Sequence, residues 1–156
     1  MKKITLTQGK YALVSDKDFK YLNQFKWYYK KKKTERTGYA ARKHPSSNNT
    51  VFMHQLILKA KNVDHKDGDG LNNQRHNIRI ATKSQNQWNR GKSKSKNNTT
   101  GFKGVSTLSG NRRKKFFASL QVNYEYKYIG AFETALEAHE AYIKEVKKYH
   151  GRFARW

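Results

Sequence analysis

The alternation of apolar and polar residues predicts several short strands in the first half of the chain. The predicted strands cover residues 2–5, 10–14, 27–29 and 38–42. A Gln8-Gly9 turn separates the first two strands, and a basic loop at residues 30–37 separates the last two. The first half is therefore expected to be rich in hairpins.

Two short helices are expected among these strands. Ser15 and Asp18 have the spacing of a capping box, which predicts a helix over residues 16–25. Residues 51–58 form the most apolar stretch of this half and predict a strand that runs into a helix. This stretch is expected to supply core residues.

Residues 63–90 are predicted to form a β-hairpin followed by a helix. The predicted order is a strand carrying Asp64 and His65, a tight turn at residues 67–70, a strand over 77–81, and a helix over 83–90 capped by Thr82. Such an arrangement directs polar groups into the angle between the hairpin and the helix.

A change of composition divides the chain at residues 91–100, which contain no apolar residue and predict a linker. Beyond it, the pattern predicts strands over residues 101–105, 115–122 and 124–131, and a helix over 135–149 that follows Thr134 and ends at Gly151. We therefore predict an α+β chain with two domains, residues 1–90 and 101–156. The second domain is expected to be a three-stranded antiparallel sheet packed on one helix.

The charge of the chain indicates a polyanionic partner. Among 156 residues, 34 Lys and Arg stand against 11 Asp and Glu, a formal charge of +23. Aromatic residues make up 13% of the chain, so this is not a disordered basic arm, and nucleic acid is the expected partner. The sequence has no cysteine, no apolar N-terminal leader and no long apolar segment, so we expect no membrane association and a cytoplasmic location.

The segment from Asp64 to Asn86 has the residue types that phosphodiester hydrolysis needs. Asp64 and Asn86 offer hard oxygen ligands that suit Mg²⁺ or Mn²⁺, and His65 has a pKa suited to a general base. On a regular strand the Asp64 and His65 side chains point to opposite faces, so either the chain bends or the substrate crosses the edge. Arg79 alternates with two isoleucines expected to face the core, and is predicted to project outward to a phosphate.

The spacing of polar residues in this segment resembles the HNH motif of phage and intron-encoded homing endonucleases. The matching residues are Asp64-His65-Lys66-Asp67-Gly68, Asn72-Asn73, Asn77-Ile78-Arg79, Thr82 and Asn86. A weaker likeness extends upstream to Arg42 and to Met53-His54. The resemblance implies a ββα-metal nuclease that cuts double-stranded DNA, encoded by a phage or an intron and acting inside the cell.

The resemblance also implies a role for each matching residue. Asp64 and Asn86 would bind the metal, and His65 would act as the general base. Asn77 would brace the loop of the catalytic site through hydrogen bonds, and Asn72 and Asn73 would shape the turn. The third letter of the motif is often His and is Asn86 here, which favours an oxygen-binding cation.

Residues 100–156 resemble the Apetala-type (ethylene-response) DNA-binding domain found in plants and attached to some phage HNH nucleases. The matching marks are Gly101, Gly104-Val105, a basic second strand, and Tyr128-Ile129-Gly130 with Phe132 before an alanine-rich helix. The resemblance implies that the outer face of the sheet binds the major groove. The residues expected to contact DNA are Lys103, Arg112, Arg113, Lys115, Gln121, Tyr126 and Lys127 in this half, with Arg79 and Arg90 in the first half.

The sequence excludes one interpretation of the turn at residues 67–70 and leaves other questions open. The turn at residues 67–70 is not an EF-hand, because no closing glutamate follows. His54 fits a structural role or a supporting role in the site, whereas His139 fits packing or the surface. The expected state is a monomer on an asymmetric target, with a dimer as the alternative. The rival functions are a homodimeric restriction-type HNH enzyme and a non-catalytic DNA-binding regulator.

Overall fold

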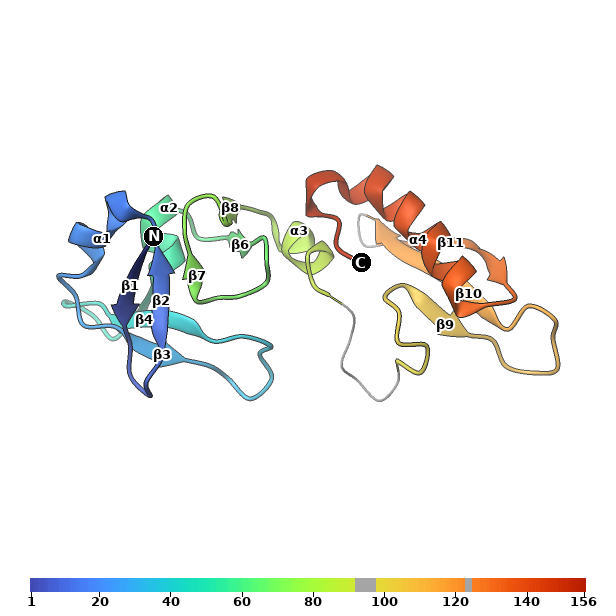
Figure 1. The fold of residues 1–156 in the computed structure, drawn as a ribbon, viewed down its shortest axis with the longest axis horizontal. Helices are drawn as coiled ribbons and strands as arrows, with labels where there is room; N and C mark the ends of the chain where they lie inside the picture. The colour runs from blue at the N-terminus through green and yellow to red at the C-terminus, as the bar shows by residue number, and fades with distance from the viewer. Residues whose placement is uncertain (92–97, 123–124) are drawn as a thin grey trace. The chain divides into compact units, whose positions relative to one another are not determined.

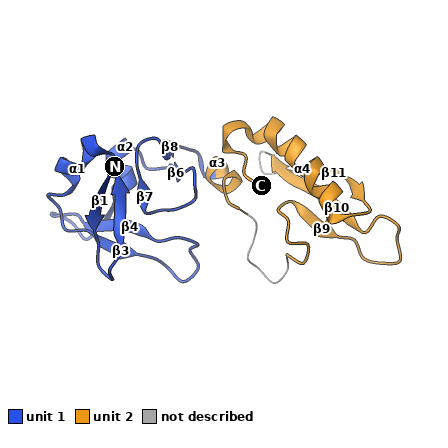
Figure 2. Cartoon of the chain, in the orientation of Figure 1, with its two compact units in different colours: residues 1–83 blue, residues 84–156 orange. Residues whose placement is uncertain are grey.

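The computed structural model describes residues 1–91, 98–122 and 125–156 and divides into two compact units (Figures 1 and 2). The first unit is Met1–Lys83 and the second is Ser84–Trp156. The division comes earlier in the chain than the expected domain end at residue 90. Most of the expected linker, residues 92–97, and residue 124 of an expected strand lie outside the described residues. No helix in the described ranges is long and apolar enough to cross a membrane.

The first unit begins with a small sheet in the order β1-β2-β7. Strands β1 (Lys2–Thr5) and β2 (Tyr11–Val14) are antiparallel and confirm the predicted hairpin, while β7 (Asn72–Asn73) adds to β2 in parallel. Gln8 and Gly9 form the turn, both with positive φ. This sheet brings a segment from the predicted catalytic region against the N-terminal hairpin.

Helix α1 (Asp16–Leu22) follows β2 and ends earlier than predicted. The predicted capping box is wrong, because the Ser15 side chain accepts no hydrogen bond from the helix. Ser15 Oγ instead accepts from the Arg75 backbone N–H at 2.9 Å, and the Asp18 carboxylate pairs with the Arg75 guanidinium at 2.8 Å. The two polar side chains thus hold residue 75, which lies far along the chain, rather than the helix end.

A second sheet, in the order β3-β4-β5, carries the predicted basic hairpin. Its strands are β3 (Tyr28–Lys30), β4 (Tyr39–Lys43) and β5 (Thr50–Phe52), and β5 leads directly into α2 (Met53–Leu58), as predicted. Helix α2 contacts β4 and β5 and also β6 (Val63–His65) and β8 (Ile78–Ile80), which form an antiparallel pair. Buried apolar side chains of both sheets, α1, α2, β6 and β8 form one core, which includes Val14, Leu22, Trp27, Met53 and Ile78.

The second unit contains α3 and a sheet covered by one long helix. Helix α3 (Lys83–Trp88) begins at the last residue of the first unit, and the sheet has the order β11-β10-β9. The strands are β9 (Val105–Thr107), β10 (Phe116–Val122) and β11 (Glu125–Phe132), all antiparallel to their neighbours. Helix α4 (Ala135–His150) packs on the sheet, and a 3-10 turn (Gly151–Phe153) follows it.

Two details of this unit follow from local chemistry. Thr134 and Glu137 form a complete capping box at the start of α4. The predicted strand over residues 101–105 is wrong, since β9 begins only at Val105. Gly101 and Gly104 both have positive φ, which turns the chain before the strand can start.

Candidate functional site

Asp64 forms a buried ion pair with Arg79. The two residues are directly opposite each other in the β6–β8 pair, and Arg79 Nε and Nη2 lie 2.8 Å and 2.7 Å from Asp64 Oδ2. Only 11% of the Arg79 side chain and 7% of the Asp64 side chain are exposed. The prediction that Arg79 projects outward is therefore wrong, and Ile80, which was expected to face the core, is exposed instead.

His65 is buried next to Asn73 on the neighbouring segment. Its Nε2 lies 3.3 Å from Asn73 Oδ1, and Asn73 is fully buried. The Asn73 amide nitrogen donates to the Leu71 carbonyl at 3.1 Å, so its oxygen is the atom that faces the imidazole. In the neutral ring, Nε2 therefore carries the hydrogen and Nδ1 carries the lone pair of a base.

A second histidine, His54 from α2, packs against His65. The two rings meet edge to face with centroids 4.9 Å apart, and Tyr39 and Phe52 border His54 at 5.5 Å and 5.6 Å. His54 is buried, and its Nδ1 has no hydrogen-bond partner. The sequence placed His54 in an apolar run, and only its weak upstream likeness to the motif pointed to the site.

Burial determines the protonation of both histidines. Burial, with a smaller contribution from His65, lowers the pKa of His54 to about 3. Burial also lowers the pKa of His65, although its contact with Asn73 and the carboxylates of Asp67, Asp64 and Asp69 act in the opposite direction. Both imidazoles are therefore neutral at neutral pH, as a general base requires.

Asn77 braces the turn that follows His65. Its side-chain nitrogen donates to Asp67 Oδ1 at 2.9 Å and to the Asn72 carbonyl at 2.8 Å, and its oxygen accepts from the Asp67 backbone N–H at 3.1 Å. Asn72 in turn donates to Asp67 Oδ2 at 2.7 Å. Burial tends to raise the pKa of Asp67, but the hydrogen bonds from Asp69, Asn77 and Asn72 hold that pKa below its usual value. These contacts hold the turn after His65, and a role of Asn77 in catalysis stays a prediction.

Asn86, the expected second metal ligand, and Arg90 fall in the second unit. Asn86 lies on α3 and is half-buried, and Arg90 is exposed just beyond the helix. The end of α3 is held within this unit, because the Trp88 ring stacks on His150 at 4.3 Å and the Trp88 carbonyl accepts from Lys103 Nζ at 2.7 Å. The roles of Asn86 and Arg90 stay predictions from the sequence.

The chain is similar in sequence to a viral protein that is named as a nuclease. The chain is 29% identical over 153 residues to an uncharacterized HNH endonuclease of Acanthamoeba polyphaga mimivirus, with 94% of the chain and 74% of the viral protein covered. This similarity supports an HNH-type nuclease. No family model and no solved structure matches the chain.

The two residues expected to bind a metal both offer oxygen atoms. Among the described residues, no group of three His, Cys, Asp or Glu side chains could hold a metal ion. Asp64 supplies a buried carboxylate in which Arg79 holds one oxygen, and Asn86 is the expected amide donor. Carboxylate and amide oxygens are donors that Mg²⁺ and Mn²⁺ prefer, and the binding of a metal by Asp64 and Asn86 stays a prediction.

The residues expected to contact DNA in the second unit differ in their surroundings. Lys127 was expected on the outer face of the sheet, and that expectation is wrong, because its ammonium group bonds to Tyr149 and pairs with Glu145 at 3.1 Å on α4. Lys103 donates to two backbone carbonyls, those of Trp88 and Arg155.

Other expected DNA contacts remain at the surface of this unit. Tyr126 is 82% exposed. Gln121 is half-buried, and its backbone carbonyl contacts His150. Arg113 is exposed and pairs with Glu133 at 2.7 Å, and Arg112 and Lys115 are exposed in the loop before β10. Their contact with DNA stays a prediction.

Proposed function

We propose that the chain is a metal-dependent DNA endonuclease that hydrolyses phosphodiester bonds at His65. The observation that carries this proposal is the buried His65, neutral and held by Asn73 with Nδ1 as its basic nitrogen. It directly follows Asp64, whose carboxylate is also buried, in strand β6. Phosphodiester hydrolysis requires a hard oxygen ligand for a cation and a neutral base. Asp64 offers the first and His65 the second. The similarity to a protein named HNH endonuclease agrees with it.

In this proposal His65 Nδ1 removes a proton from the attacking water. Asn73 accepts from Nε2–H, which keeps the ring in one orientation and stabilises the imidazolium once the proton has arrived. Burial keeps the ring neutral until then, because the charged form is poorly solvated. Asn77 keeps the following turn rigid, so the position of His65 does not depend on a flexible loop.

Mg²⁺ or Mn²⁺ would be held by Asp64, with Asn86 as the predicted second ligand. When bound, the cation supplies positive charge to the phosphate and to the leaving oxygen. Arg79 pairs with Asp64 and fixes the orientation of its carboxylate. Arg79 thus acts through Asp64, where the sequence had suggested a direct phosphate contact.

The second unit would hold double-stranded DNA through its sheet and the exposed arginines and lysine before β10. One active site per chain cuts one strand at a time, so a monomer of homing type would nick its target. A homodimer would cut both strands of a symmetric site.

The experiment that tests this proposal compares the wild-type chain with His65→Ala on supercoiled plasmid, in Mg²⁺ and in EDTA. The plasmid carries a site selected from a random DNA pool by binding in EDTA. We expect open-circle product from the wild type in Mg²⁺ only, and a loss of at least about 100-fold in His65→Ala. His76→Ala, which removes an exposed histidine, is the matched control and should cut normally.

Full activity in His65→Ala would refute the role of His65 as general base. Cutting in EDTA would refute the dependence of cleavage on a metal. Tight binding with no cutting by the wild type would favour the DNA-binding regulator. The ratio of open-circle to linear product separates a nicking monomer from a dimer that cuts both strands.

A further inference from the structure

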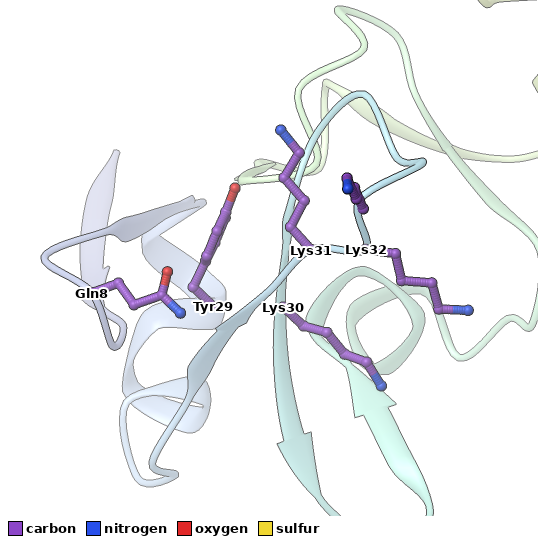
Figure 3. A pocket seen from close by; sticks show the side chains of 6 residues that line it. Gln8, Tyr29, Lys30, Lys31 and Lys32 are labelled. Carbon is purple, nitrogen blue, oxygen red and sulfur yellow. The ribbon is translucent and has the colours of Figure 1, made fainter.

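Four successive lysines border one open pocket in the first unit. Lys30 ends β3, and Lys31, Lys32 and Lys33 begin the loop to β4. With Gln8 and Tyr29 they line a pocket of about 460 Å³, which no acidic side chain lines (Figure 3). The candidate nuclease site does not include these residues.

The lysines of this pocket are not paired with acidic side chains in the described part of the chain. Within the described residues, none of the four lysines forms an ion pair, and Lys31, Lys32 and Lys33 are exposed. The one acidic side chain of the loop, Glu35, accepts from the Lys32 backbone N–H at 2.9 Å, so it shapes the loop. Adjacent like charges repel each other, and an anionic ligand relieves that repulsion.

Lys30 differs from the other three because its ammonium is already held. Lys30 Nζ donates to Thr50 Oγ1 at 3.0 Å and lies 5.6 Å from the centre of the Phe52 ring. It therefore anchors the base of the loop on β5, while the next three lysines extend beyond it. Tyr29 forms a fixed wall, since its ring packs so closely on Gly38 that a Cβ there would lie 2.0 Å from it.

The lysine loop is joined to the turn that follows His65. The Gly70 N–H donates to Thr37 Oγ1 at 3.0 Å, and a Cβ on Gly70 would lie 2.5 Å from the Gly38 carbonyl oxygen. Gly70 ends the turn that begins at Asp67, which Asn77 braces. The lysines and the candidate base therefore belong to one packed unit, connected through the end of the same hairpin.

We propose that Lys31, Lys32 and Lys33 bind backbone phosphates of duplex DNA that flank the phosphodiester at His65. Three adjacent cations along an open pocket match a series of phosphates better than a single enclosed anion. Gln8 and the Tyr29 hydroxyl are suited to donate hydrogen bonds to phosphate or sugar oxygens. Such contacts position the duplex and carry no base specificity. Only the placement of the cut at His65 rests on the proposed function.

The test measures binding of a fluorescein-labelled random-sequence 30-base-pair duplex in EDTA over a series of KCl concentrations. The variant is Lys31→Ala/Lys32→Ala/Lys33→Ala, with Lys30 retained because it anchors the loop. The slope of log K against log salt is negative, and each lost phosphate contact reduces its magnitude by about 0.9, so the loss of three contacts reduces it by about 2.7. The matched control, Lys17→Ala/Lys20→Ala/Lys26→Ala, removes three exposed lysines of the same unit and should change the slope by less than one contact.

The proposal is overturned if the magnitude of the slope decreases by less than about 0.9 in the loop variant, or by the same amount in both variants. It is also overturned if the wild-type chain does not bind the duplex at all. The assay needs no cleavage, so a loop-dependent slope in a chain that does not cut DNA in Mg²⁺ keeps the phosphate site and removes the nuclease. If the chain cuts, the loop variant should raise KM several-fold with little change in kcat, whereas His65→Ala lowers kcat.

Discussion

The buried His54 should make the first unit sensitive to acid. Its folded-state pKa of about 3 lies far below the ordinary value of 6.5, so between these two pH values the unfolded chain binds a proton on His54 and the folded chain does not. The resulting stability is fully present above about pH 6.5 and is lost as the pH falls from there toward 3. Each pH unit in this window costs about 1.4 kcal/mol.

Between pH 7 and pH 5, this linkage removes about 2 kcal/mol from the free energy of unfolding of the first unit. A loss of this size is a large share of the stability of a small domain. His65 faces His54 and has its own pKa lowered by burial, so its contribution has the same sign. Replacing His54 alone therefore isolates one of the two contributions.

The assay is urea denaturation followed by the fluorescence of Trp27, which is buried in the first unit. Trp88 and Trp156 are replaced by Phe in every variant so that only Trp27 reports. We expect His54→Leu to lose about 2 kcal/mol less than its parent between pH 7 and pH 5, whatever its absolute stability. His76→Gln, which changes an exposed histidine, should keep the parent's dependence. An unchanged pH dependence in His54→Leu would show that His54 does not titrate as its burial requires.

Two further predictions concern stability. Arg79→Ala leaves the Asp64 carboxylate buried without its guanidinium and should lower the free energy of unfolding, measured by urea denaturation, by about 3–5 kcal/mol. Arg113→Ala, which breaks an exposed pair, should have little effect. Equal losses in the two variants would refute the burial argument. Gly104→Ala places a Cβ 2.1 Å from the Tyr142 ring at positive φ and should cost about 2–4 kcal/mol, and Gly101→Ala, which has positive φ but open space, separates the steric cost from the backbone cost.

Much of the fold was predictable because its strands and helices have local signals. The hairpin around Gln8-Gly9, the strand leading into α2, and the helix after Thr134 all follow from turn residues, periodicity or capping. The capping box at Ser15 failed although its spacing was correct. Its side chains are used by Arg75, and no local pattern contains a contact to so distant a residue.

The candidate site was predictable in its composition and less so in its geometry. The motif identified Asp64, His65 and Asn77, but alternation along β8 predicted an outward Arg79. Residues directly opposite each other in an antiparallel pair share one face, so Arg79 lies with Asp64 on a face that is buried and not open to solvent. Alternation alone does not show which face is covered. His54 was not assigned to the site because its proximity to His65 depends on how α2 packs on β6.

The anchoring of α3 has a consequence for chimeric enzymes. The change of composition suggests residues 91–100 as the junction at which to exchange the predicted DNA-binding module. A junction there separates Asn86 and Trp88 from Lys103 and His150, which hold the end of α3. A junction before Lys83 keeps the whole helix with its supports. The exchangeable part thus includes a predicted metal ligand, so grafted recognition modules must bring their own α3.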